Sequence, residues 1–510
     1  MPAPQDPPEP RRGLVLTVLV LPLFMALMSV SIVNVSLPAI QQGLHASTAQ
    51  LQWVLSGFAL TFGLLLVPAG RLGDVVGRRT LFLVGVALFT LTSLGAALAT
   101  SATTLNLWRV AMGIGSGVLN PQIIGLVQQH FHGAERARAF GVMGAFIGMA
   151  MAVGPLLGGL IIGAAGPDLG WRWTFGVNVP VGLLTLLVAW RWLPREDRHP
   201  GARRAAGGGR ARTDLDPVGV VLFGASILLV MLPFLHVTDA AWIWGSLPAG
   251  ALALLGWLAW ERRYRGRGHD PMVDLALLRE RGFAFGTVLI LCYFIGLAPS
   301  WAVLAIFVQD GLGHSALVAG VVTVPAALAG AVASAAGGRL VTRWGRPLVA
   351  WGAALAVAGQ LATGLVAVLM GDHRLVLWAL AASFVAIGAA QGLVIGPNQS
   401  LTLAAVPIAH GGAAGGVMQT GQRVGAAIGL AVGTGVLFAT LGARDWPQAV
   451  LAAFLSMSLA TSVALVVAVV DARRRRDRGE SLRGAVTGPR SLDTSPDTSP
   501  DTSAAASPRS

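Results

Sequence analysis

The stretch Gly70-Arg71-Leu72-Gly73-Asp74-Val75-Val76-Gly77-Arg78-Arg79 separates two long apolar segments of the chain. Its glycines permit a tight turn and a close approach between helices. Asp74 is a lone carboxylate among arginines at the expected end of a helix, where it could pair with an arginine or with a helix N-terminus. We therefore expect residues 70–79 to form a structured connection with a definite partner.

The pattern occurs a second time in the other half of the chain. Gly70-Arg71-Leu72 is repeated as Gly338-Arg339-Leu340, and Gly77-Arg78 is repeated as Gly345-Arg346. Several such matches in the same order indicate a duplicated unit. Two parallel copies related by an axis along the membrane normal are typical of transporters, with the binding site between the halves.

The composition is that of a membrane protein. Of the 510 residues, 54% are apolar and 12% are charged, and the mean hydropathy is +0.69. A soluble domain is about one quarter charged, so these values exclude a soluble enzyme, a secreted disulfide scaffold and a disordered chain. Because a membrane span needs about 20 apolar residues, we expect an all-α polytopic protein of fourteen transmembrane helices. They are expected at 13–39, 52–70, 80–100, 104–128, 138–164, 172–193, 216–236, 242–260, 283–309, 316–338, 347–370, 375–404, 412–440 and 447–470.

The arginines predict the orientation. All 36 basic residues are arginine. Of these, 31 precede the first expected helix, follow the last one or lie in the connections that follow even-numbered helices. Basic residues gather on the cytoplasmic side of membrane proteins, so both termini are expected in the cytoplasm of a multi-pass plasma-membrane protein. The same distribution argues against nucleic-acid binding, which the net charge of +13 would otherwise suggest.

The spans group into two six-helix halves with two helices inserted between them. The expected boundaries are 1–12 for a disordered cytoplasmic N-terminus, 13–193 for the first bundle, 194–214 for a cytoplasmic loop, 215–260 for the inserted helices, 261–282 for a second cytoplasmic loop, 283–470 for the second bundle and 471–510 for a disordered tail.

Residues 70–79 resemble the signature loop of the major facilitator superfamily. In that family the aspartate and arginines of this loop latch the two halves together on the cytoplasmic side. The resemblance implies that fold for the chain and a latch made of Gly70, Arg71, Asp74, Gly77, Arg78 and Arg79.

Two other helices carry related patterns. Arg109 lies inside an apolar run, where a charge needs a cavity or a partner, and matches an arginine linked in the family to proton coupling; the alternative is an arginine that snorkels to the outer surface. The expected helix 138–164 resembles the family's antiporter signature, found mainly in exporters. The matching residues are Gly148, Gly154, Pro155, Gly158 and Gly159.

Three further segments narrow the resemblance to the fourteen-helix drug:proton antiporters. They are Ile32–Pro38, Trp171–Phe175 with Asn178–Gly182, and Gln422–Gly429. Members of that family usually have an aspartate where this chain has Ser29, and no expected span holds an interior Asp or Glu. Since serine cannot titrate, proton coupling through the first helix is in question. Asp310 at an outer helix end is a substitute candidate, although an ordinary loop acid is the favoured interpretation.

The remaining candidates for a substrate cavity are neutral. Apolar walls with few polar groups suit a lipophilic substrate, and some of the polar groups are expected only to bond helix to helix. The cavity candidates are Ser29, Asn34, Trp53, Asn120, Gln122, Asn178, Phe294, Trp301, Gln391, Asn398 and Gln419.

The expected function is export of lipophilic drugs or antibiotics by proton antiport, by a monomer in the lipid bilayer. The alternatives are an uncoupled or non-transporting homologue, acting as a facilitator or sensor, and an exporter of a neutral or anionic metabolite. An enzyme is disfavoured because no His, Cys, Asp or Glu cluster has metal-ligand spacing. We expect neither a cofactor nor a metal.

Overall fold

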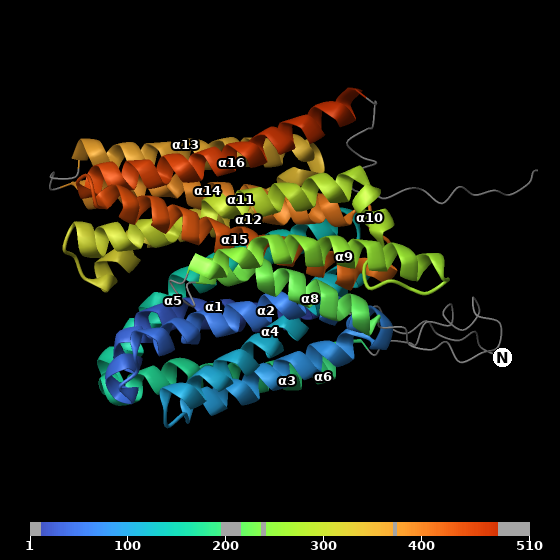
Figure 1. Cartoon of the computed structure of the whole chain (residues 1–510), viewed down its shortest axis with the longest axis horizontal. Coiled ribbons are helices and arrows are strands. Elements are labelled where there is room, and N and C mark those ends of the chain that lie inside the picture. The colour runs from blue at the N-terminus through green and yellow to red at the C-terminus, as the bar shows by residue number, and fades with distance from the viewer. Residues whose placement is uncertain (1–11, 195–215, 236–240, 371–374, 478–510) are drawn as a thin grey trace, which may run out of the picture.

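The computed structural model describes residues 12–194, 216–235, 241–370 and 375–477, and these residues form helices and short connections (Figure 1). The first half holds α1 Arg12–Leu44, α2 Thr48–Val76, α3 Arg78–Ala97, α4 Ala102–His130, α5 Gly133–Gly176 and α6 Asn178–Trp192. The middle holds α8 Pro217–Met231, η1 Leu232–Leu235, η2 Ala241–Gly245, α9 Ser246–Gly266 and α10 Leu275–Arg279. The second half holds α11 Arg281–Ile306, η3 Phe307–Gly311, α12 Ala316–Trp344, α13 Arg346–Met370, α14 Val376–Leu403, η4 Ile408–His410, α15 Gly411–Leu441 and α16 Trp446–Asp477.

Thirteen helical stretches of the described chain are long and apolar enough to cross a membrane. One of them, Gly133–Trp192, has 60 residues, which as one straight helix would measure about 90 Å, three times the hydrocarbon core. It is interrupted at Gly166, whose φ of 76° and ψ of 166° are not helical. The stretch therefore corresponds to the two spans expected at 138–164 and 172–193.

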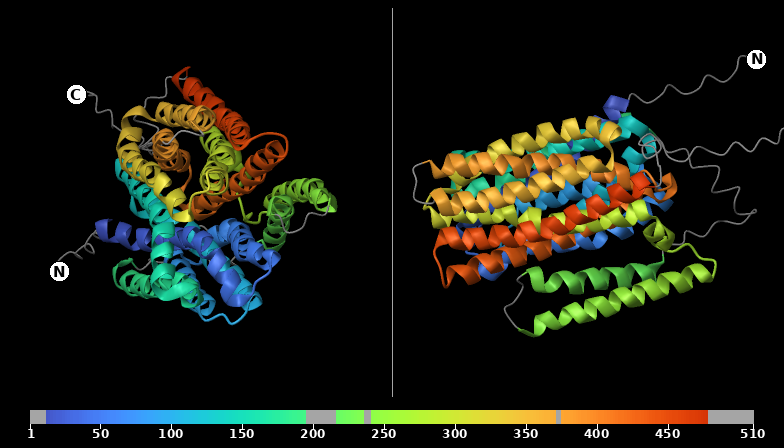
Figure 2. Two further views of the ribbon diagram at one scale, coloured as in Figure 1. Left: turned by 90° about the vertical axis from the view of Figure 1, so that its left-hand side faces the viewer. Right: turned by 90° about the horizontal axis from the view of Figure 1, so that it is seen from above.

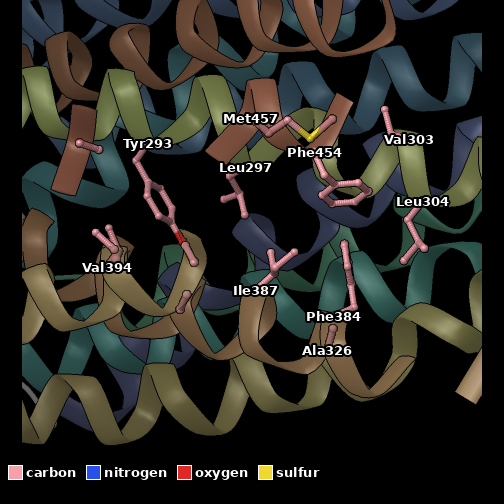
Figure 3. Packing of buried hydrophobic residues seen from close by; sticks show 14 of the residues in the cluster. Tyr293, Leu297, Val303, Leu304, Ala326, Phe384, Ile387, Val394, Phe454 and Met457 are labelled. Atoms are coloured by element: carbon pink, nitrogen blue, oxygen red, sulfur yellow. The ribbon is translucent and has the colours of Figure 1, made fainter. Parts of the chain in front are cut away.

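The helices form two bundles that lie side by side (Figure 2). Figure 3 shows the core of the second bundle, where Tyr293 and Leu297 of α11 lie near Phe384, Ile387 and Phe454 from other helices. The fold class expected from the sequence, two six-helix halves with two inserted helices, is confirmed. Burial of apolar side chains against neighbouring helices fixes how the polar residues within each bundle are placed.

The inserted helices α8 and α9 form a hairpin on the side of the two bundles (Figure 2). Phe223 of α8 packs on Trp257 of α9 with 5.0 Å between ring centroids. Their buried cluster includes Val67 of α2 and Val424 of α15. The insertion therefore covers the line along which α2 and α15 meet.

Several helices extend beyond their expected ends. Helix α2 continues to Val76, so residues 70–76 are helical and Gly77 alone joins α2 to α3. Two other helices enter regions expected to be loop or tail. Helix α9 continues to Gly266 into the loop expected at 261–282, where α10 also forms, and α16 continues to Asp477 into the expected tail. Asp471 is buried there beside Arg346, so this turn packs on the bundle instead of leaving it. Residues 1–11, most of the expected loop 194–214 and residues 478–510 lie outside the described residues.

Candidate functional site

Asp74 and Arg78 form a buried pair where α2 meets α15. Their side chains are 1% and 6% exposed, and Arg78 donates to Asp74 Oδ1 from Nη2 at 2.7 Å and from Nε at 3.0 Å. The two oxygens of Asp74 also accept the backbone N–H groups of Gly412 and Ala413, each at 3.0 Å. Both amides lie in the first turn of α15, so the carboxylate of one half caps the positive end of a helix dipole in the other half.

Small residues allow α2 and α15 to come this close. A Cβ on Gly70 would lie 2.3 Å from the carbonyl oxygen of Gly412 in α15. A Cβ on Gly73 would lie 1.9 Å from Gln122 Oε1 of α4, so this glycine serves the contact with α4 in the same half. Gly77 joins α2 to α3 with a φ of 121°, in the region that favours glycine. Gly70 thus lets α2 lie close enough to α15 for the Asp74 carboxylate to reach it.

Further hydrogen bonds tie the same corner together. Arg78 donates to the carbonyl oxygen of Gly125 in α4 at 2.7 Å and to that of Ile408 in η4. Gln128 of α4 donates to the carbonyl oxygens of Leu403 and Val406 at 2.9 and 3.1 Å. We call the end of the bundle where these contacts lie the latch end; α1 begins and α16 ends there, at the right of Figure 1.

The other two arginines of the expected latch have different partners. Arg79 Nη2 donates to the Trp190 carbonyl oxygen at 2.8 Å, within its own half. A nitrogen of Arg71 lies 3.8 Å from a carboxylate oxygen of Asp270, whose side chain is 84% exposed. Of the six residues, Gly70, Asp74 and Arg78 therefore make the contacts that cross between the halves.

The glycines of the antiporter pattern in α5 face two different helices. A Cβ on Gly148 would lie 3.2 Å from the Ala327 carbonyl oxygen of α12. A Cβ on Gly154 would approach Ser31 of α1 at 2.7 Å, and one on Gly158 would approach Ile32 at 2.8 Å. Pro155 lies between these two contacts, inside α5. Gly159 has no such neighbour within 4 Å, so packing does not explain a glycine there.

The two coupling candidates lie in different environments. Arg109 is 1% exposed, its Nε donates to the Val54 carbonyl oxygen at 2.8 Å, and its guanidinium carbon lies 4.4 Å from the Phe58 ring centre. The side chain therefore points into the bundle and does not snorkel to the surface. Asp310 is exposed in η3 of the second half, as an ordinary loop acid would be.

Several of the polar cavity candidates bond one helix to another. Asn178 of α6 donates to Ser29 Oγ of α1 at 3.4 Å, Gln122 to the Ala69 carbonyl oxygen at 2.8 Å, and Asn398 to that of Gly286 at 2.9 Å. Asn120 donates within its own helix, to the Ser116 carbonyl oxygen at 2.9 Å.

The remaining candidates are at least partly accessible. Asn34 and Trp53 are exposed, and Trp301 is half-buried with its ring 4.9 Å from that of Phe384. The other half-buried members of this group are Phe294, Gln391 and Gln419.

The site candidates taken from the sequence omit Arg423 and the rings of α2. Arg423 of α15 places its guanidinium carbon 4.4 Å from the Phe62 ring centre, and the Phe58 and Phe62 ring centres are 5.7 Å apart. Two signals could have found them: a charge inside the apolar segment 412–440, and two phenylalanines four residues apart on one helix face.

Comparison with known proteins agrees with this geometry. The family model described as Major Facilitator Superfamily matches residues 19–430, with a second match over 286–496. The probable actinorhodin transporter of Streptomyces coelicolor is 31% identical over 446 residues, which are 86% of this chain and 74% of that protein. The multidrug resistance protein Stp of Mycobacterium tuberculosis is 32% identical, over 78% of this chain and 70% of that protein. The proton:xylose symporter XylE shares the fold, with a TM-score of 0.61 and 16% identity over 90% of this chain and 95% of that one. The chain therefore belongs to the major facilitator superfamily, a family of membrane transporters, and is not an enzyme.

Proposed function

We propose that the protein exports lipophilic small molecules, drugs or antibiotics, out of the cell across the plasma membrane, as a monomer and in exchange for protons. Two relatives support this proposal, since one is named as an actinorhodin transporter and the other as a multidrug resistance protein. The arginine distribution supports a cytoplasmic latch end and cytoplasmic termini.

The observation that carries the proposal is the Asp74 latch. A transporter of this fold alternates between two packings of its halves around a central site. The contacts of Asp74 with Gly412 and Ala413 exist only while α2 and α15 are together at the latch end. The latch therefore stabilises the state closed to the cytoplasm, and an exporter must open it to load substrate from inside.

A second candidate is export without proton coupling through α1. Ser29 is fully buried and is hydrogen-bonded to Asn178, so the position holds a neutral group that cannot carry a proton. A carboxylate at this depth would be desolvated and would titrate nearer to neutral pH. Ser29→Asp should therefore add a proton-dependent component to transport if the wild type lacks one.

The test uses inside-out membrane vesicles that carry the protein. Uptake of a fluorescent lipophilic dye is measured with a pH gradient that makes the vesicle interior acidic. The measurement is repeated after a protonophore has collapsed this gradient. Uptake abolished by the protonophore supports proton antiport. Gradient-independent uptake in the wild type that becomes gradient-dependent in Ser29→Asp supports the second candidate. Vesicles that take up no member of a dye and antibiotic panel would refute the export proposal.

A further inference from the structure

Two arginines from opposite halves stack on two phenylalanine rings of α2. The guanidinium carbon of Arg109 lies 4.4 Å from the Phe58 ring centre, and that of Arg423 lies 4.4 Å from the Phe62 ring centre. The two rings are one helical turn apart, with 5.7 Å between their centres. We call these four side chains, two from α2 and one each from α4 and α15, the arginine–phenylalanine cluster.

The cluster faces the inside of the molecule. Helix α4 packs on one side of α2, where Thr61 Oγ1 donates to the Val110 carbonyl oxygen at 2.9 Å. Helix α15 packs on the other side, where Gly70 meets Gly412. Phe58 and Phe62 lie between these two sides, are each 3% exposed and belong to a buried cluster that includes residues of α1. The cluster therefore lies where the two halves meet, at the place expected for a substrate.

No acidic side chain among the described residues forms an ion pair with this cluster, so neither Arg109 nor Arg423 takes part in one there. Arg109 Nη1 and Arg423 Nε are buried and have no hydrogen-bond acceptor. The Phe175 ring centre also lies 5.9 Å from the Arg109 guanidinium carbon. Aromatic rings offset part of the cost of a buried cation, and an anion would offset the rest.

Arg172 is another arginine stacked on an aromatic ring, and its guanidinium has backbone acceptors. Its guanidinium also stacks on an indole, 4.4 Å from the Trp171 ring centre. However, its Nη1 donates to the carbonyl oxygens of Ala97 and Ala99, at 3.0 and 2.6 Å. Arg109 has one such bond and a buried Nη1 left over, so its surroundings leave a donor available for a ligand.

We propose that the arginine–phenylalanine cluster binds the acidic group of the substrate, and that the exported molecules are lipophilic aromatic acids. The anion would pair with Arg109 and Arg423, and the aromatic body would stack on Phe58 and Phe62. This inference rests on the proposed export function and specifies its substrate class. Because Arg109 belongs to α4 and Arg423 to α15, one bound anion would join the two halves.

The test measures binding, so it does not depend on transport. Three pyrene probes with the same aromatic body are titrated into the purified full-length protein by fluorescence anisotropy: 1-pyrenesulfonate, 1-pyrenemethanol and protonated 1-pyrenemethylamine. We expect the sulfonate to bind at least tenfold more tightly than the alcohol and the amine to bind most weakly. Arg423→Gln and Arg109→Gln should each weaken sulfonate binding at least tenfold and change alcohol binding less than twofold.

Matched variants keep the test decisive. Arg172→Gln removes a stacked arginine outside the cluster and should leave all three affinities unchanged, whereas Arg109→Lys keeps the charge and should retain most of the sulfonate preference. If the Arg109→Gln variant is not expressed, the comparison of probe affinities between the wild type and Arg423→Gln still tests the inference, because Arg423 is partly exposed. Equal affinities for the three probes, or a sulfonate preference that survives in both glutamine variants, would overturn the inference. A sulfonate preference in a protein that transports no dye would refute only the export proposal.

Discussion

The interface of α2 with α15 and the interface of α12 with α5 are counterparts in the duplicated fold. In the first, a Cβ on Gly70 would lie 2.3 Å from the Gly412 carbonyl oxygen; in the second, a Cβ on Gly338 would lie 2.7 Å from that of Ala137. Both interfaces therefore depend on small residues where the backbones approach. The counterpart of Asp74, by the sequence repeat, is Thr342, which donates only to Arg339 in its own helix.

The arginines of the two repeats differ in the same way. Arg78 pairs with Asp74 and also reaches the Ile408 carbonyl oxygen in the other half. Its counterpart Arg346 pairs with Asp471 of α16 at 3.0 Å and donates to the Gly282 carbonyl oxygen at 3.0 Å, all within the second half. Duplication thus kept the arginine in both copies, and the contact described across the halves is that of Arg78 with Ile408. We infer that a charged latch joins the halves at the α2–α15 interface, whereas close backbone packing joins them at the α12–α5 interface.

The largest effect is expected from Gly70→Leu. The new side chain would overlap the backbone of α15, and overpacking of this kind costs about 1–3 kcal/mol or more, so closure of the latch end should fail and dye export should be lost. The measurement is export at matched expression. Gly163→Leu in α5 is the control, because a Cβ there meets nothing within 4 Å. Full export by Gly70→Leu would show that the close approach is dispensable.

Asp74→Asn should reduce export at least tenfold while leaving expression normal. It removes the charge that caps α15 and leaves Arg78 buried without its carboxylate, a loss of about 3–5 kcal/mol for a buried pair. Thr342→Val at the counterpart position should change export less than twofold. Similar losses in both variants would remove the distinction between the two interfaces.

Asp471→Asn should mainly affect stability. Arg346 and Asp471 are each 6% exposed and belong to the same half, so breaking the pair should lower the thermal unfolding midpoint of the purified protein. Export at a permissive temperature should fall less than threefold. If export instead fell as far as in Asp74→Asn with an unchanged unfolding midpoint, Arg346 would have to act between the halves.

Arg71→Gln should have the smallest effect of this set. Arg71 is buried, but its partner at 3.8 Å, Asp270, is exposed, and an ion pair with a solvated partner contributes about 0–1 kcal/mol. We expect export within twofold of wild type at physiological salt. A tenfold loss would mean that the loop after α9 takes part in the latch.

The sequence predicted the helices, and it singled out Asp74 without indicating its partners. Apolar length and the arginine distribution were enough for the fold, and the glycines around Asp74 were enough to single out that carboxylate. The amides of Gly412 and Ala413 could not be predicted, because a backbone donor at a helix start has no residue signature. The Arg346–Asp471 pair was missed because Asp471 follows the apolar run and therefore seemed to begin the tail.

The interior of the bundle was the least predictable part. Arg109 could be recognised as an unusual charge, but its burial between Phe58 and Phe175 depends on how α2, α4 and α5 pack. Asn178, Gln122 and Asn398 were possible cavity residues from sequence, and in the structure each bonds to another helix. Which polar group faces a substrate and which one joins helices is set by rotation about the helix axis, and a uniformly apolar span does not fix that rotation.

The most direct test of the central claim is a pair of distances measured by double electron–electron resonance in a Cys292→Ser background. One pair of spin labels spans the α2–α15 interface at Val76 and Ile408, which are 51% and 42% exposed. The other spans the α12–α5 interface at Trp344 and Ala134, both exposed. We expect Asp74→Asn to add a population with a longer Val76–Ile408 distance and to lengthen the Trp344–Ala134 distance less. An unchanged Val76–Ile408 distance, or equal lengthening of both, would contradict it.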